Sequence, residues 1–372
     1  MNQRDGLTGR GARGVIVESI PWNRFQLFTD ERTPMTRIKD VALAAGVAPS
    51  SASRALTGHP NVSPELRARV QAAALRLNYR PNAVARSLRS TGTRTIGLVV
   101  SDLLNPFFTE LARAVEDAAR QAGFSVIVGN ADENPGQQDH YVRILLERQV
   151  DGLIVVPTAE TSPLLHEAAA RGDHLVLVDR PAADVDAPSV LADGTDAITE
   201  LVDHLVHTGR RDLAIITGPD QAGSSRQRLA AFRDALARHS RPLPSSRVRH
   251  GDFRRDSGRI ELAALLAGSS VPDAVFVANG SMALGAIEYL AKHRDSAPRV
   301  PESLAVAVFD DLPWFSLLSP TLTAIEQPTA ALGRRAVEML LDRIAGRQVS
   351  DERLGCVLHL RESTQGPEGA SR

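Results

Sequence analysis

Apolar and polar residues recur with two different periods along the chain, and the change falls near residue 94. Between residues 38 and 77, apolar side chains return every three or four positions in three short segments, which Gly46 and Ser63-Pro64 separate. This spacing predicts three helices, the last with a serine N-cap and a proline in its first turn. Two short helices around a glycine turn are typical of a helix-turn-helix module.

From Thr95 onward, short apolar runs alternate with longer amphipathic segments, first up to Asp193 and then again after it. Such alternation predicts an α/β body with two parallel sheets and helices on both faces of each. Two open sheets side by side place a ligand cleft at the carboxyl ends of their strands. The expected strands are 96–100, 125–128, 152–156, 174–178, 213–217, 274–278 and 304–309, and the expected helices are 107–121, 137–148, 164–171, 197–208, 226–239 and 282–293.

Charge is distributed unevenly along the 372 residues, although 43 basic and 44 acidic side chains give a net charge of only −1. The segment 36–94 holds two acidic residues, Asp40 and Glu65, against ten basic ones, so its balance is 10 − 2 = +8 and the rest of the chain carries −1 − 8 = −9. A basic module on an acidic body is typical of a nucleic-acid-binding protein. The ten are Arg37, Lys39, Arg54, Arg67, Arg69, Arg76, Arg80, Arg86, Arg89 and Arg94.

Several classes of protein are disfavoured by what the sequence lacks. A single cysteine, Cys356, excludes an internal disulfide framework and a cysteine-rich zinc module, and its apolar surroundings predict a buried thiol. No apolar run is long enough to span a membrane and no secretory signal is visible, so we expect a cytoplasmic protein without a membrane partner. No phosphate-binding loop, zinc-protease motif or hydrolase elbow is present, so we expect neither an enzyme nor a bound cofactor or metal.

Three segments resemble the LacI/GalR (lactose repressor) family of bacterial transcription regulators. They read IKDVALAAGVAPSSASRAL, VSPELRARVQAAALRLNYRPNAVARSLRS and TIGLVVSDLLNPFF, and the resemblance runs from about Met35 to Thr364. It implies an N-terminal three-helix helix-turn-helix DNA-binding domain and a hinge helix, joined to a two-lobed body like that of periplasmic sugar-binding proteins.

The resemblance also implies a set of DNA-binding residues. Pro49 and Ser50 would open the recognition helix in the major groove, Arg54 would contact a base edge or phosphate, and Leu88 would wedge into the minor groove. One departure is Ala48, where many members have a serine that caps this helix. The full set is Pro49, Ser50, Ser51, Ser53 and Arg54 on the recognition helix, and Asn82, Ala85, Arg86 and Leu88 on the hinge helix.

The family's effector contacts, carried over by the resemblance, fall beside strand ends or on the helix that bears SSRQRLAAF. Aromatic faces suit sugar or base rings, while Asp310 and Arg228 could grip a polyol or a polar heterocycle from opposite sides. The sequence departs from the family pattern at Gly280, where an aspartate is usual, and at Ala231 and Val308, where glycines are usual. The expected effector residues are Phe107, Phe108, Asp179, Arg228, Phe253, Asn279 and Asp310.

The expected domain order has five parts. Residues 1–34 are an extension, either disordered or preceding an incorrectly assigned start; 35–80 are the helix-turn-helix domain; 81–93 are the hinge helix and linker; 94–366 bind the effector and dimerise; and 367–372 are a tail. Within the body, one lobe is expected at about 94–192 and 322–348, and the other at about 193–321 and 349–366.

These features predict a ligand-responsive transcriptional repressor that binds pseudo-palindromic double-stranded operator DNA as a homodimer. A sugar, a nucleobase or a related polar metabolite would bind in the cleft between the lobes. The sequence does not decide whether this effector releases or promotes DNA binding. The runner-up is a solute-binding protein of a transport system, and a third alternative is an enzyme that uses the cleft. No leucine heptad follows the expected strand 356–360, so a dimer is expected rather than a tetramer.

Overall fold

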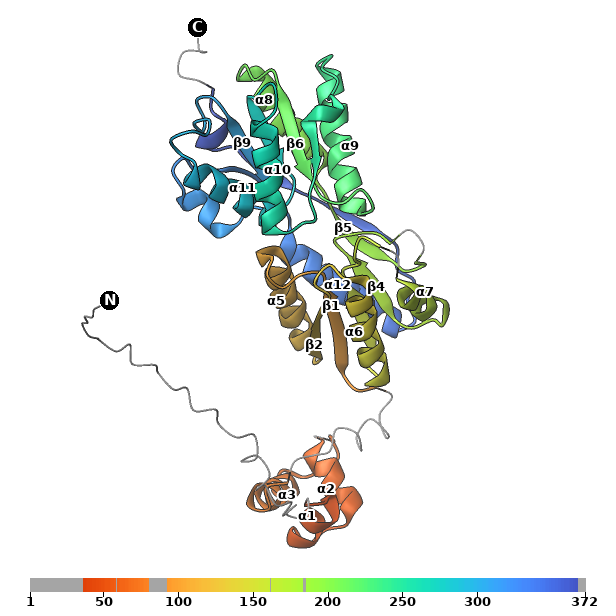
Figure 1. Cartoon of the computed structure of the whole chain (residues 1–372). Helices are drawn as coiled ribbons and strands as arrows, with labels where there is room; N and C mark the ends of the chain where they lie inside the picture. Colours follow the sequence, from red (N-terminus) through yellow and green to blue (C-terminus); the bar gives the residue numbers. More distant parts are fainter. Residues whose placement is uncertain (1–35, 58, 80–91, 161, 183–184, 367–372) are drawn as a thin grey trace, which may run out of the picture. The chain divides into compact units, whose positions relative to one another are not determined.

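The computed structural model describes residues 36–57, 59–79, 92–160, 162–182 and 185–366. The chain forms two compact units, Met1–Arg86 and Ser87–Arg372 (Figure 1). The expected hinge-helix residues Asn82, Ala85, Arg86 and Leu88, and the expected extension and tail, lie outside the described residues. Among the described residues, no helix combines the length and apolarity needed to cross a membrane.

The first unit contains three helices around a small core. They are α1 (Ile38–Ala44), α2 (Pro49–Leu56) and α3 (Pro64–Arg76). Gly46 lies between α1 and α2 with φ of 64°, a left-handed conformation that glycine adopts without steric cost. Small side chains dominate the core, which lets the helices cross closely. Its buried members are Val41, Ala42, Ala45, Ala52, Ala55, Val70, Ala73 and Ala74.

The first lobe of the second unit is a parallel sheet covered on both faces. Its strand order is β11-β5-β4-β3-β1-β2, and every pairing is parallel. Helices α5 and α12 pack side by side on one face, and α6 and α7 cover the other (Figure 1). The elements are β1 (Thr95–Val100), α5 (Pro106–Gln121), β2 (Ser125–Asn130), α6 (Pro135–Glu147), β3 (Gly152–Val155), α7 (Pro163–Ala170), β4 (Leu175–Val178), β5 (Ser189–Asp193), α12 (Thr329–Ile344) and β11 (Glu352–Gly355).

The second lobe repeats this architecture with the order β12-β10-β9-β8-β6-β7, in which only β12 is antiparallel to its neighbour. Helices α8 and α9 pack on one face, and α10 and α11 pack on the other. The elements are α8 (Thr195–His207), β6 (Leu213–Thr217), α9 (Gly223–Arg238), η2 (Ser245–Arg247), β7 (Val248–His250), α10 (Arg255–Leu266), β8 (Ala274–Val277), α11 (Gly280–Lys292), β9 (Ala305–Phe309), η3 (Pro313–Leu317), β10 (Thr323–Glu326), β12 (Val357–His359) and η4 (Glu362–Thr364).

The chain passes between the two lobes three times: after β5, between β10 and α12, and between β11 and β12. The later two passages differ from the lobe limits expected near residues 322 and 349. Strand β10 pairs with β9 of the second lobe, and β11 pairs with β5 of the first. The expected limits were wrong by several residues because strands of four residues take their lobe from their pairing partners, which the local pattern does not contain.

Candidate functional site

Helix α2 presents a polar face to solvent. Its alanines, Ala52 and Ala55, are buried against the other two helices. On the opposite side Pro49, Ser50 and Arg54 are exposed, and the remaining two serines of the predicted set, Ser51 and Ser53, are half-buried. The predicted recognition-helix residues therefore lie on one short helix, with their polar atoms available to a partner.

The start of α2 lacks the side-chain cap that the start of α3 has. Ala48 precedes Pro49 and accepts no side-chain hydrogen bond, whereas the Ser63 hydroxyl accepts a bond of 3.3 Å from the Leu66 amide. The first-turn amides of α2 are therefore left without a side-chain acceptor from the capping position. Free amides at a helix N-terminus favour an anion such as a DNA phosphate. The net charge of residues 36–79, six basic against two acidic side chains, is 6 − 2 = +4 and points the same way.

All seven residues predicted to contact an effector are buried, with exposed fractions of 2–8%. Three of them directly follow or lie just beyond a strand with positive φ: Asp179 at 70°, Phe253 at 67° and Asp310 at 74°. Residues other than glycine are uncommon in this region, and the strain, about 1–3 kcal/mol each, is typically found at functional sites. The fold thus holds these three side chains in orientations that an unstrained backbone would not give.

Arg228 on α9 is buried and fixed at two points. Its Nη1 donates a 2.8 Å hydrogen bond to the Ala278 carbonyl oxygen, and its guanidinium carbon lies 3.7 Å from the centre of the Phe309 ring. Burial lowers the pKa of Arg228, while the nearby carboxylates of Asp310 and Asp179 oppose this shift. Arginine nevertheless remains charged at neutral pH. The structure therefore holds the Arg228 cation over the face of Phe309 inside the body.

Asp310 is the acceptor for two bonds that link different elements. Its Oδ2 accepts a hydrogen bond of 2.9 Å from the Gly280 amide at the start of α11, and its Oδ1 accepts one of 2.6 Å from Gln327 Nε2. Asn279 accepts a 3.0 Å bond from the Met282 amide and so caps α11. Asn279 thus has a structural task in addition to any ligand contact.

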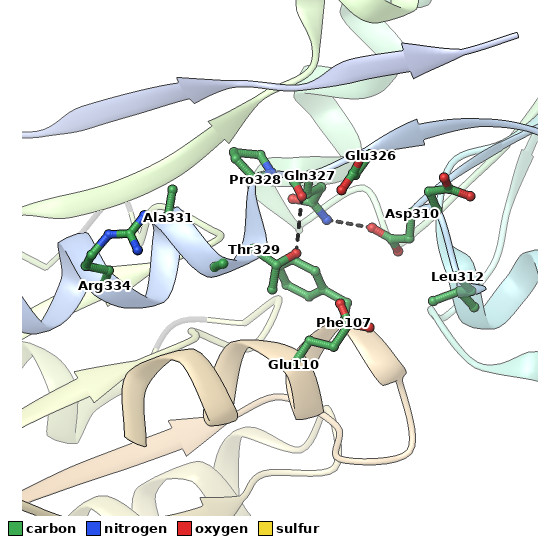
Figure 2. A pocket seen from close by; sticks show the side chains of 12 residues that line it. Phe107, Glu110, Asp310, Leu312, Glu326, Gln327, Pro328, Thr329, Ala331 and Arg334 are labelled. Atoms are coloured by element: carbon green, nitrogen blue, oxygen red, sulfur yellow. Dashed lines mark hydrogen bonds between the residues drawn. The ribbon is translucent and has the colours of Figure 1, made fainter. Parts of the chain in front are cut away.

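A cavity of about 380 Å³ lies where the two lobes meet (Figure 2). Phe107 and Glu110 come to it from α5 of the first lobe, and Asp310 comes from the second lobe. The Gln327 amide oxygen, on the passage between β10 and α12, is buried and has no hydrogen-bond partner among the described residues. The volume and the unpaired acceptor suit a small hydroxylated ligand.

Two of the other predicted effector residues lie away from this cavity. Asp179 and Arg228 line a narrow recess together with Phe309, and Asp179 Oδ1 has no hydrogen-bond partner within the described ranges. Burial raises the pKa of Asp179, although Arg180 and Arg228 oppose the shift. The structure therefore places Phe107 and Asp310 at the cavity and Asp179 and Arg228 at the recess, while Phe108, Phe253 and Asn279 are buried without lining either one.

Arg180 and Glu133 belong to this region and were missed by the sequence analysis. Arg180 Nη1 and Nη2 donate bonds of 2.9 and 2.7 Å to the two carboxylate oxygens of Glu133, and Nε lies 3.2 Å from Asp179 Oδ2. The only available signal was the charged residue directly after Asp179 at the end of a buried strand. Nothing in the sequence pairs it with a glutamate 47 positions earlier.

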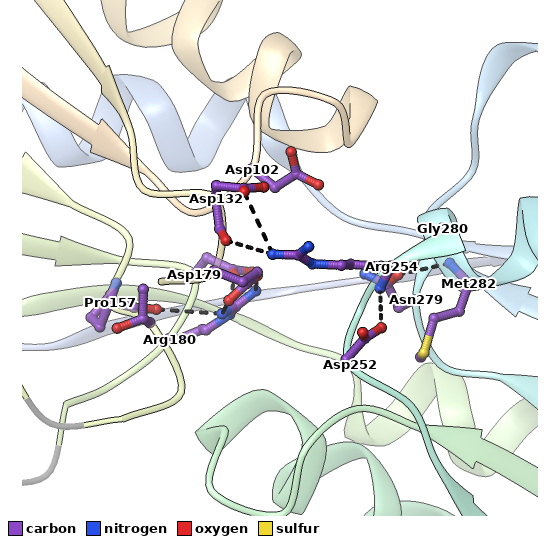
Figure 3. Close-up of polar contacts among 12 residues, drawn as sticks. Asp102, Asp132, Pro157, Asp179, Arg180, Asp252, Arg254, Asn279, Gly280 and Met282 are labelled. Carbon is purple, nitrogen blue, oxygen red and sulfur yellow. Dashed lines mark hydrogen bonds and ion pairs between the residues drawn. The ribbon is translucent and has the colours of Figure 1, made fainter. Parts of the chain in front are cut away.

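The two lobes are also joined at the edge of this region by a direct contact (Figure 3). Arg254 Nη2, which follows β7 of the second lobe, donates a 2.8 Å bond to the Asp132 carbonyl oxygen in the loop after β2 of the first. The same guanidinium lies 3.6 Å from Asp132 Oδ2. This contact connects the lobes and would break if they moved apart.

One group of side chains has the composition of a metal site. Asp311, Glu326 and His359 place one ligand atom each within 4.8 Å of one another. All three side chains are already engaged by protein partners, because Arg361 donates to both oxygens of Asp311 and His359 Nε2 lies 2.6 Å from Glu326 Oε2. Burial raises the pKa of the Cys356 thiol to about 12, so this half-buried cysteine stays protonated and is a poor metal ligand or nucleophile.

A helix-turn-helix unit with an exposed polar helix, joined in one chain to a two-lobed body with polar groups between the lobes, defines a DNA-binding regulator with a ligand-binding domain. Two family comparisons agree with this class. Residues 37–82 match the bacterial regulatory proteins of the lacI family, and residues 93–359 match the periplasmic binding proteins and sugar binding domain of the LacI family. The chain belongs to the LacI family of bacterial transcription regulators.

Relatives in sequence and in structure are similar over nearly the same length. The HTH-type transcriptional regulator PtxS of Pseudomonas aeruginosa is 38% identical over 312 residues, covering 83% of this chain and 89% of that protein. The ribose operon repressor of Escherichia coli is 33% identical over 325 residues, covering 86% and 96%. The structure of the lac repressor dimer bound to operator and the anti-inducer ONPF has a TM-score of 0.78 and 31% identity, covering 89% of this chain and 99% of that one.

Proposed function

We propose that this protein represses transcription by binding a pseudo-palindromic operator as a homodimer and that a small molecule between the lobes controls this binding. The observation that carries the proposal is one chain with an uncapped, exposed recognition helix and a separate group of buried polar side chains, Asp179, Arg228 and Asp310. The recognition-helix residues would read DNA, and the interlobe residues would read the ligand. Such a regulator works on DNA in the cytoplasm.

The control mechanism follows from linkage. A ligand changes DNA affinity only if it binds the DNA-competent arrangement of the lobes with a different affinity from the other arrangement. Residues from both lobes line the cavity, so a ligand there would contact both and bias their relative position. A typical coupling free energy of about 1–3 kcal/mol would change operator affinity by about 5- to 150-fold.

Two related proteins have been solved together with their partners. The lac repressor was solved as a dimer on operator DNA with ONPF, and the regulator CelR was solved with cellobiose, at 30% identity and a TM-score of 0.66. A sugar-like effector for this chain rests on those likenesses and on the cavity of about 380 Å³, and a nucleobase-like effector rests on the Phe107 ring that lines this cavity. A solute-binding protein of a transport system would have no use for the helix-turn-helix unit. We propose no catalytic activity for the cleft.

A footprint of the purified protein on the DNA upstream of its own gene tests the main proposal. We expect a protected pseudo-palindrome with a distorted centre at moderate salt. The same experiment with each sugar or nucleobase that raises the melting temperature should change the protection. A protein that protects no sequence, with or without such ligands, while binding them tightly would favour the solute-binding alternative.

The dimer surface that we propose lies on the first lobe, along α5 and β2. Strand β2 is at the edge of its sheet, and its Ile127 and Val128 are 40% and 43% exposed. A groove of about 660 Å³ runs beside them between α5 and β2. Exposed apolar side chains on an unpaired strand edge are typical of a surface that is covered by another chain.

Changing Val128 to arginine should therefore convert the dimer into a monomer and weaken operator binding, because the charge would be buried at the subunit contact. Sedimentation velocity measures the oligomeric state. Val271→Arg, at a site 45% exposed in the second lobe, is the matched control and should remain dimeric. A Val128→Arg protein that stays fully dimeric would place the subunit contact elsewhere.

Gly280 is a site where the usual family residue would disturb this cleft. A Cβ atom at this position would lie 3.0 Å from both Cβ and Oδ2 of Asp310. Gly280→Asp should lower ligand affinity and the melting temperature, at a cost of about 1–3 kcal/mol, because it adds a second carboxylate beside a buried one. Gly280→Ala controls for the steric part, and equal ligand affinities of the two variants would remove the charge argument.

A further inference from the structure

The Glu133–Arg180 ion pair occupies the space between the lobes and is almost completely shielded from water. The exposed fraction of the side chain is 4% for Arg180 and 10% for Glu133. Both carboxylate oxygens of Glu133 are engaged by the two terminal nitrogens of Arg180, in the parallel geometry that arginine forms with carboxylates. Burial disfavours the charged form, but Glu133 and Asp179 outweigh it and raise the pKa of Arg180. The guanidinium charge is thus fully compensated by the protein.

The same guanidinium lies against aromatic rings from both lobes. Its carbon is 4.6 Å from the centre of the Phe253 ring of the second lobe and 5.8 Å from that of Phe108 on α5 of the first. Phe253 can take this place because residue 218 is glycine, where a Cβ would lie 2.1 Å from the ring. Arg180 is therefore at a contact between the lobes that includes two of the predicted effector residues, and it influences what can bind beside them.

The loop that carries Glu133 is strained into this position. Asp132 and Glu133 have backbone φ angles of 52° and 49°, in a region that residues other than glycine and asparagine rarely adopt. Asp102, at the end of β1, is also buried nearby. Burial first, and then the charges of Asp132 and Glu133, raise its pKa. Negative charge is thus concentrated where the first lobe faces the second.

Arg228 is the second buried guanidinium of this region, whereas Arg254 and Arg334, which also reach it, are exposed. Arg228 is stacked on Phe309 and bonded to a carbonyl oxygen, and its charge is shared between Asp310 and Asp179. Three buried carboxyl groups, Glu133, Asp179 and Asp310, interact with two buried guanidinium groups, Arg180 and Arg228, so the formal charge of this central group with all five ionised is 2 − 3 = −1. The unpaired oxygens of Asp179 and Gln327 are acceptors for hydroxyl groups.

We propose that the Glu133–Arg180 pair is a specificity device that restricts the effector to uncharged polyhydroxy compounds and excludes sugar acids and sugar phosphates. This inference rests on the proposed function, because it names the ligand class of the same cleft. An anionic group would enter a dry, net negative site in which both central arginines are already engaged, and like charges at close range in low dielectric repel strongly. A hydroxyl group donates to the free acceptors without that penalty.

The test compares neutral monosaccharides with their anionic counterparts as probes of melting temperature and binding. The probe pairs are D-glucose with D-glucuronate, D-galactose with D-galacturonate, and D-ribose with its phosphate monoester. For the full-length wild-type protein we expect at least one neutral probe to bind and its anionic partner to bind about 100-fold more weakly or not at all. Calorimetric titration measures the ratio.

The variant Glu133→Gln makes the inference specific to this pair. Its amide oxygen still accepts a bond from Arg180, but the carboxylate charge is gone, so the central group changes from −1 to 0. We expect the anionic partner to gain affinity, which brings the ratio to within about tenfold. Glu133→Asp keeps the charge and should keep the exclusion. Glu147→Gln, exposed at the end of α6 in the same lobe, controls for the loss of one carboxylate outside the cleft.

Three results would overturn the inference. They are tighter binding of an anionic probe than of its neutral partner by the wild type, an unchanged ratio in a folded Glu133→Gln protein, and no binding of any neutral probe. If Glu133→Gln does not fold, the neutral-to-anionic affinity ratios of the wild type and of Glu133→Asp test the inference instead. The operator footprint is measured in parallel. If an anionic probe changes operator binding, the protein is still a ligand-responsive regulator as proposed, but the exclusion of anionic effectors is wrong.

Discussion

Replacing Arg228 with alanine is expected to abolish the response of operator binding to ligand at concentrations that saturate the wild type. Arg228 is a buried cation that interacts with both Asp310 and Asp179, and its Nη1 donates a hydrogen bond to the Ala278 carbonyl oxygen just beyond β8. A charged hydrogen bond lost in a buried site costs about 1.5–3 kcal/mol, and Asp310 and Asp179 would also lose one nearby positive charge. We therefore expect ligand affinity to fall by about 100-fold or more.

Arg226→Ala is the matched control for this result. Arg226 lies two positions away on the same helix, and its replacement removes the same charge. Its side chain is exposed and donates hydrogen bonds to the Asp220 and Gln221 carbonyl oxygens. It should respond to ligand like the wild type. Arg228→Ala should still bind operator in the absence of ligand if its arrangement of lobes is DNA-competent. An Arg228→Ala protein that responds at wild-type ligand concentrations would remove Arg228 from the effector site.

Replacing Arg54 with alanine is expected to weaken operator binding by about 1–3 kcal/mol, or about 5- to 150-fold. We expect a much smaller loss in the binding of random DNA. Arg54 is exposed on α2, on the opposite side from the buried alanines. No ion pair to another described residue holds its guanidinium, so it is available to a guanine edge. Gel-shift titrations on operator and on random DNA at several salt concentrations give both affinities and the salt slope.

Arg76→Ala, on the exposed last turn of α3, removes the same charge from the same unit. We expect this control to lower operator and random-DNA affinity by similar small factors, because it changes only the general electrostatic attraction. Equal losses on both DNAs for Arg54→Ala, with a salt slope smaller by about one, would assign Arg54 to a phosphate instead of a base.

The capping position of α2 is occupied by Ala48, which offers no side-chain acceptor. Ala48 leaves the first amides of α2 without a side-chain acceptor, as the sequence indicated. This prediction could be made without a structure because capping depends on residue types only a few positions apart. The prediction of Ser63 as the N-cap of α3 was confirmed for the same reason, since its hydroxyl accepts from Leu66.

The elements with a clear local period were predicted from the sequence to within a few residues. The three helices of the first unit, β1, α5, β6, β8 and β9 all fall where the apolar pattern indicated. The elements that the sequence analysis did not predict are short, or lie where the local pattern was not decisive: β5, β7, α10, β10, α12 and β11. A strand of three or four residues contains too few positions to show a period, and its pairing partner decides whether it forms.

The amino-acid sequence by itself determined the class of protein, because helix spacing, charge distribution and motifs over short stretches are local properties. The residues predicted for the effector, such as Asp179 and Asp310, were carried over from the resemblance to the family, and each directly follows a strand. The tertiary structure alone decided that Arg180 pairs with Glu133 and stacks on Phe253 of the other lobe. Ion pairs and ring contacts depend on distances between residues far apart in the chain, which the packing of the sheets sets and a linear pattern does not contain.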